Sequence, residues 1–219
     1  MGRAMTGYSF DLQGAALTAL PSGALWWADQ SMIVVSDLHL GRSERIARLG
    51  GALIPPYEVE DTLGRLDTLV ADHAPRSVIC LGDTFDDSAA ADLPDGPRLW
   101  LARMMAGRRW IWIAGNHDPA PVNVGGEQLA ELRLGPLTFR HIAEQGAVGE
   151  VSGHYHPKLR LAGQARACFL LDESRLILPA FGTYTGGLDA RDKALRPLLS
   201  NPALAILTGR TARPVPLTY

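Results

Sequence analysis

The sequence predicts an α/β protein in which helices cover the faces of β-sheets. In the first half of the chain, short apolar runs alternate with segments of helical periodicity, whereas the second half consists mainly of apolar runs. Glycine and proline are spread between these short elements and are not gathered into a linker. We therefore expect one continuous domain over residues 1–219.

Seven apolar runs have the length and the residue types of β-strands. They are residues 32–36, 77–81, 109–114, 132–139, 148–152, 167–171 and 203–207. Three segments have helical periodicity, at residues 42–53, 57–73 and 97–106. In the second of these, one face is apolar and consists of Leu63, Leu66, Leu69 and Val70.

Composition sets limits on location and partners. Of 219 residues, 47% are apolar and 20% are charged, which is ordinary for a compact soluble domain. The net charge of -2 does not by itself attract nucleic acid, but divalent ions bound to carboxylates would make the working face more positive. Two cysteines, Cys80 and Cys168, are too few for a disulfide framework, and no apolar stretch is long enough to span a bilayer. We expect a cytoplasmic protein with no membrane partner.

Side chains that can bind metal follow the predicted strands. The motifs are Asp37-Leu38-His39, Gly82-Asp83, Gly115-Asn116-His117-Asp118 and Gly153-His154-Tyr155-His156, with His141 between the last two. Each motif alone is compatible with a turn or a cap. However, of the six histidines only His73 lies outside the set, and ligand sites of α/β proteins form at the carboxyl ends of strands. This concentration favours one shared site.

The spacing within two motifs suggests how the side chains are presented. Residues i and i+2 of an extended backbone point to the same side. We therefore expect Asp37 with His39, and His154 with His156, to form two-pronged ligand sets. The same alternation would turn Tyr155 away from the metal.

Together the motifs resemble the calcineurin-like metallophosphoesterase superfamily, whose pattern is DxH, GDxxD, GNHD or GNHE, a solitary His, and GHxH. The resemblance covers Met32 to about Pro157. It implies a four-layer α/β/β/α sandwich in which two mixed sheets are flanked by helices. It also implies two divalent metal ions that share a hydroxide, which would attack the phosphoester.

The resemblance assigns a role to each residue of the motifs. The first ion would be held by Asp37, His39, Asp83 and His156, and the second by Asp83, Asn116, His141 and His154. Asp83 would bridge the two ions. His117 would stand beside the reacting phosphate without binding metal, and Asp118 would orient it. The ligands are imidazoles and oxygens without thiolate, a set that suits Mn, Fe or Zn.

Departures from the family pattern narrow the class of phosphoester that the protein is expected to cleave. Protein phosphatases of this superfamily carry GDxxDRG and GNHE, but here no arginine follows Asp86 and the later motif is GNHD, which favours a phosphodiester. The stretches SDLHLGRSERIARLGGALIPPYEVEDTLGRL, VICLGDTFDD, WIAGNHDP, GEVSGHYHPK and LPAFGTYTGGL are similar to bacterial ligase-associated DNA-damage-response metallophosphoesterases. That similarity implies a Mn-dependent DNA endonuclease in DNA repair, functionally associated with a DNA ligase and a helicase.

Contacts to DNA are predicted less directly. Arg42, Arg45 and Arg48 follow the first motif, and Lys158 and Arg160 follow the last, so both groups are candidates for phosphate contacts at the cleft, with a solvated face as the alternative. Candidates for stacking on unpaired bases, as in single-stranded DNA, are the aromatic residues Phe85, Tyr155, Phe181 and Tyr184. The alternative is that these rings are buried in the core.

Two alternative functions stay open. One is a small-molecule phosphodiesterase or nucleotide pyrophosphatase of the same fold. The other is a scaffold that binds a partner without catalysis, which the complete ligand set, with His117, argues against.

Overall fold

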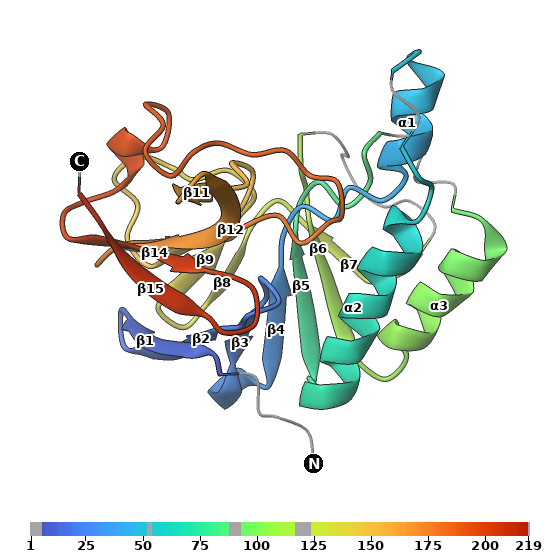
Figure 1. Ribbon diagram of the computed structural model, residues 1–219. Coiled ribbons are helices and arrows are strands. Elements are labelled where there is room, and N and C mark those ends of the chain that lie inside the picture. The colour runs from blue at the N-terminus through green and yellow to red at the C-terminus, as the bar shows by residue number, and fades with distance from the viewer. Residues whose placement is uncertain (1–5, 52–53, 88–92, 117–123, 219) are drawn as a thin grey trace.

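The computed structural model describes residues 6–51, 54–87, 93–116 and 124–218. Two β-sheets pack against each other, and helices cover the outer face of the first sheet (Figure 1). This arrangement confirms the expected sandwich of two mixed sheets with flanking helices. In the described part of the chain, no helix is long and apolar enough to cross a membrane.

The first sheet has seven strands in sequence order. They are β1 (Tyr8–Leu12), β2 (Ala15–Ala19), β3 (Leu25–Trp27), β4 (Met32–Val35), β5 (Ser77–Leu81), β6 (Arg109–Ile113) and β7 (Glu127–Leu129). Strands β1 to β4 pair antiparallel, whereas β4 to β7 pair parallel. The parallel part brings the carboxyl ends of β4, β5 and β6 to one edge of the sheet.

The second sheet has eight strands, ordered β15-β14-β12-β13-β10-β9-β8, with β11 paired to β12. They are β8 (Leu132–Leu134), β9 (Leu137–Phe139), β10 (Glu150–Ser152), β11 (Lys158–Leu161), β12 (Gln164–Leu171), β13 (Arg175–Ile177), β14 (Ala203–Leu207) and β15 (Arg213–Leu217). Strand β10 runs parallel to both of its neighbours, β9 and β13, and the other pairs are antiparallel.

The helices are α1 (Arg42–Arg48), α2 (Glu58–His73) and α3 (Asp95–Met105), with short 3-10 helices η1 (Ala28–Gln30) and η2 (Arg196–Leu198). The predicted apolar face of α2 packs against the first sheet, together with Leu101 and Met104 of α3. Figure 1 shows α1 beyond the strand ends, apart from the two longer helices. On the outer face of the second sheet, the described cover consists of Leu198 of η2 and irregular segments that include Leu188 and Leu195.

Strand β4 shows how one apolar run serves two cores. Met32 and Val34 belong to the cluster between the sheets, whereas Ile33 and Val35 belong to the cluster beneath the helices. All four are buried because alternate side chains of a strand point to opposite faces. Strand β4 therefore has no polar residue until it ends, and the polar side chains that follow it mark the edge of the sheet.

Two predicted elements differ from the structure. The run 132–139 is a hairpin of β8 and β9, because Gly135 has φ 56° and Pro136 follows it, so Leu134 pairs with Leu137. The helix predicted over 42–53 ends at Arg48, before Gly50 with φ 72°, and residues 52–53 lie outside the described residues.

A buried ion pair fixes the register of β10, which leads directly to the GHxH motif. Glu150 of β10 lies opposite Arg175 of β13, and Arg175 Nη1 donates to Glu150 Oε1 at 2.9 Å. Both side chains are inaccessible to solvent, at 0% and 2% exposure. Arg175 also donates to the carbonyl oxygens of Glu144 and Ala147, so most of its charged group is satisfied.

We predict that Arg175→Met lowers the free energy of unfolding by about 3–5 kcal/mol, because Glu150 would stay buried with only Arg140, at 3.7 Å, as a counter-charge. The double variant Arg175→Met, Glu150→Met should recover much of this loss. Urea unfolding midpoints measure both effects. The exposed pair Arg109–Glu127 provides the control, and Arg109→Met should shift the midpoint little. Equal shifts for the two arginine variants would contradict the role of the buried pair.

Candidate metal centre

The metal-binding motifs of both sheets meet at one place. Asp37 follows β4, Asp83 follows β5 and Asn116 follows β6. From the second sheet, His141 follows β9, and the GHxH histidines follow β10. His117 and Asp118 lie outside the described residues.

The backbone at these motifs is left-handed and not extended. Positive φ angles occur at Asp37 (53°), His39 (45°), Asp83 (45°), His154 (70°) and His156 (47°). Such angles cost a non-glycine residue on the order of 1 kcal/mol or more and are found at functional sites. The prediction that an extended backbone presents these side chains by i, i+2 alternation is therefore wrong. Sharp local turns orient them instead.

Glycines permit the close approach that these turns require. Gly82 has φ 74°, and a Cβ there would lie 2.4 Å from His141 Nδ1. A Cβ on Gly153 would lie 1.7 Å from Ser36 Oγ and 2.6 Å from Asp37 Oδ2. The glycines of GD and GH thus bring the two sheets into contact beside the ligands.

Asp37, His39 and His156 form a first cluster, whose candidate ligand atoms all lie within 4.8 Å of one another. His156 Nε2 lies 3.2 Å from Asp37 Oδ1 and 3.3 Å from His39 Nε2. Asp37 Oδ1 is buried and has no hydrogen-bond partner among the described residues. A buried carboxylate oxygen that faces two imidazole nitrogens fits a metal ligand well.

Asp83, His141 and His154 form a second cluster of the same size. His141 Nε2 lies 3.4 Å from Asp83 Oδ2 and 3.2 Å from His154 Nδ1. Asn116 Oδ1 joins this cluster at 2.8 Å from His141 Nε2. The other ring nitrogen of His141 contacts the carbonyl oxygen of Leu81 at 2.8 Å, and such a contact fixes the ring orientation.

Asp83 lies between the two clusters, since its Oδ2 is 3.4 Å from His141 Nε2 and 3.9 Å from His39 Nε2. The alternation argument grouped His154 and His156 as one two-pronged set, the family resemblance assigned them to different ions, and they lie in different clusters. The turn at this motif explains the division, because both residues have positive φ and their rings diverge. The chain thus contains two candidate metal sites with a carboxylate between them.

Charge and burial act in opposite directions on two neighbouring rings. Burial lowers the pKa of His141, but its hydrogen bond to Asp83 and the charges of Asp37 and Asp83 outweigh burial and raise that pKa. Burial, together with the charge of His141, lowers the pKa of His154. A lowered pKa favours the neutral imidazole, which is the form that binds metal.

Asp86, which sequence analysis did not select as a site residue, supports the first cluster. Its Oδ1 lies 2.8 Å from His39 Nδ1, which leaves His39 Nε2 directed at the cluster. Burial raises the pKa of Asp86, but the His39 hydrogen bond and the charge of Arg42 outweigh burial and hold that pKa at about 2. The sequence did contain a signal for this role, because Asp86 is the second aspartate of the GDxxD motif.

The basic residues predicted to contact DNA already have protein partners. Arg42 Nη1 and Arg45 Nη1 contact the two carboxylate oxygens of Asp86 at 2.9 and 3.2 Å, and Arg48 pairs with Asp87 at 2.6 Å. Lys158 Nζ donates to the carbonyl oxygen of Thr185, and Arg160 Nη1 to that of Gly163. Part of the positive charge of these side chains is therefore neutralised by carboxylates, and part is hydrogen-bonded to backbone carbonyl oxygens of the chain itself.

The four candidate aromatic residues differ in exposure. Phe85 and Phe181 are buried at 0% and 1%, so they belong to the core and offer no stacking surface. Tyr184 is 42% exposed. The ring of Tyr155 contacts that of His154 at a centroid distance of 4.9 Å and packs against the apolar cluster on the outer face of the second sheet.

Comparison with known proteins agrees with this geometry. The family model for calcineurin-like phosphoesterases matches residues 31–169. The crystal structure of Pseudomonas putida nuclease MPE superposes with a TM-score of 0.77 at 28% sequence identity, over 96% of this chain and 100% of that one. A search of curated proteins finds no match. Because the family model spans most of the chain and includes both clusters, the chain belongs to the calcineurin-like phosphoesterase family and is a hydrolase of phosphoesters.

Proposed function

We propose that this protein is a dinuclear phosphodiesterase that acts as a Mn-supported DNA endonuclease in repair. One observation carries the proposal: two three-residue clusters of metal-binding side chains lie side by side, with Asp83 within 4 Å of histidines in both. The nuclease that matches along its whole length supports a nucleic-acid substrate. Single-stranded DNA or DNA with unpaired regions is the proposed form.

In the proposed site, Asp37, His39, Asp83 and His156 hold one ion, and Asp83, Asn116, His141 and His154 hold the other. When bound, two such ions neutralise phosphate oxygens and activate the attacking water. Asp86 keeps His39 Nε2 directed at the site, and the Leu81 carbonyl does the same for His141 Nε2. His117 protonates the leaving oxygen, and Asp118 orients His117.

A phosphodiester is the proposed bond because a diester carries one negative charge, which the ions and His117 can offset without arginine. The arginines closest to the motifs, Arg42 and Arg45, are engaged by Asp86. That engagement also favours a second candidate, hydrolysis of a small phosphodiester or a nucleotide, because it reduces the charge available to a long strand.

Circular single-stranded DNA separates these candidates. Metal-stripped protein is incubated with the circle while Mn, Mg, Zn or Fe is added back singly, and an aryl phosphodiester is tested in parallel. Nicking of the circle with Mn supports the endonuclease. Hydrolysis of the aryl diester without nicking under any metal selects the small-molecule function.

We predict that Asp83→Ala abolishes hydrolysis and lowers bound metal from two ions per chain, because Asp83 serves both proposed sites. Elemental analysis counts the ions. Asp95→Ala, at a carboxylate that is 84% exposed, is the control and should retain both ions. An Asp83→Ala protein with two ions and full activity would falsify the shared-ligand assignment.

His117→Ala should keep near-normal metal content while turnover falls by about 10²–10⁴-fold, the usual contribution of a general acid. Metal analysis and single-turnover rates are measured on the same preparation. His73→Ala, at the end of α2, should change neither quantity. Loss of metal from His117→Ala would show that this residue is a ligand.

Asp86→Asn should weaken metal affinity about 10–100-fold, since the amide holds His39 less strongly than the carboxylate does. Metal titration of the stripped protein measures this affinity. Asp87→Asn is the matched control, because Asp87 is the adjacent carboxylate and pairs with Arg48 at the surface. Equal affinities in the two variants would remove Asp86 from the proposed support of His39.

A further inference from the structure

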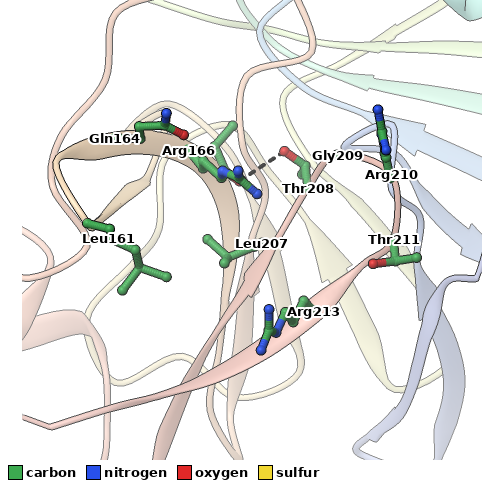
Figure 2. Close-up of a pocket in the computed structure, with 11 residues that line it drawn as sticks. Leu161, Gln164, Arg166, Leu207, Thr208, Gly209, Arg210, Thr211 and Arg213 are labelled. Carbon is green, nitrogen blue, oxygen red and sulfur yellow. Dashed lines mark hydrogen bonds between the residues drawn. The ribbon is translucent and has the colours of Figure 1, made fainter.

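A basic groove lies on the second sheet, outside the metal centre. Its volume is about 870 Å³, and its walls come from the β11–β12 hairpin and the turn between β14 and β15. Figure 2 shows Arg166 and Arg213 on opposite sides of Leu207, with Arg210 on the turn. All three arginines are exposed.

Several arginines elsewhere on the surface are neutralised by carboxylates, unlike those of this groove. Arg98, Arg103, Arg109 and Arg133 each pair with a carboxylate, as do the arginines of α1. Among the described residues that line the groove, none is acidic, and no ion pair is found for its three arginines. Three unneutralised guanidinium groups in one depression form a candidate site for an anion.

Strand register places two of the arginines on one face. Leu207 pairs with Arg213 on one side and with Cys168 on the other, and Arg166 lies two residues before Cys168 in β12. Alternation therefore puts Arg166, Leu207 and Arg213 on the same side of the sheet. Two strand spacings of about 4.8 Å across the sheet and two residues of about 3.3 Å along β12 separate the two arginine backbones by roughly 12 Å, the rise of three to four nucleotides in one strand of duplex DNA.

The groove is connected to the metal centre through a short stretch of chain. Arg166 pairs with Leu159, which is three residues after His156, or about 10 Å along an extended strand. The backbone N–H of Cys168 donates to the carbonyl oxygen of Pro157, and Thr208 Oγ1 donates to that of Ala167. These contacts fix the groove relative to His156.

We infer that this groove binds the phosphate backbone of the nucleic-acid strand whose cleavage is proposed above. The inference rests on the proposed function. Arg166 and Arg213 contact phosphates a few nucleotides from the scissile bond, and Thr211 adds a hydroxyl group. No aromatic residue is among the described lining residues, so the groove contacts backbone and not bases, without sequence preference.

The test compares Arg166→Gln, Arg213→Gln with the control Arg103→Gln, Arg133→Gln, which removes equal charge from other surfaces. Binding of a labelled 20-nucleotide single strand is measured by fluorescence anisotropy in EDTA over a series of salt concentrations. The groove variant should bind roughly tenfold more weakly, and its salt slope should fall by about 1.4, or 0.7 per lost phosphate contact. The control should keep the wild-type slope.

Hydrolysis of an aryl phosphodiester by the metal-loaded proteins shows whether each variant is folded. It should match wild type in both variants, because a small diester does not reach the groove. An unchanged affinity and salt slope in the groove variant, or loss of aryl-diester hydrolysis, would overturn the inference while wild-type DNA cleavage still supported the proposed function. A wild-type protein that neither binds nor cuts nucleic acid would instead refute the proposed function, and the groove's role with it.

Discussion

The close contact between the two sheets at the metal-binding motifs is the constraint on which the rest of the structure depends. A Cβ on Gly182 would lie 2.1 Å from the carbonyl oxygen of Leu38 in the other sheet's loop, and among the loops of the second sheet one on Gly187 would lie 2.0 Å from that of His156. Together with Gly82 and Gly153, these glycines let backbone segments touch where side chains would keep them apart. The ligands of one sheet can therefore reach those of the other.

Backbone hydrogen bonds within the first sheet and between the two sheets hold the strained backbone at Asp37 and His39. The left-handed turn at Asp37 is held by its N–H, which donates to the carbonyl oxygen of Gly82, and by the N–H of His39, which donates to that of Asp83. The N–H of Phe181 donates to Ser36 in the same way. Apolar strands on both sides, such as β4 and β5, are buried completely, and their burial offsets the cost of the turns.

Much of the fold and site could be predicted because apolar runs and metal-binding side chains leave strong patterns. Strands β1, β2, β3, β7, β11, β13 and β15 were not predicted, since they are short or alternate in exposure, and β15 contains Pro214 and Pro216. Proline is tolerated there because β15 is an edge strand. The left-handed angles at Asp37 and His154 were hidden as well, because tertiary contacts impose them on residues that do not favour them.

The arginines illustrate a second limit of sequence. Arg42, Arg45 and Arg48 were the obvious candidates for DNA contacts because they adjoin a ligand motif, yet Asp86 and Asp87, about forty residues away in the chain, engage them. Arg166 and Arg213 carry no motif and are brought together only by the register of β12, β14 and β15.

The arginines of α1 and the arginines of the groove would affect different quantities in the same reaction, the first the affinity for metal and the second the affinity for the strand. A guanidinium held by Asp86 helps to keep that carboxylate ionised, the form that accepts a hydrogen bond from His39, so its effect belongs to the affinity of the site for metal. A guanidinium without a carboxylate partner is available to a phosphate and acts on the affinity for a long strand. Because one set lies on α1 and the other on the second sheet, substrate binding and metal retention can be altered independently in this chain.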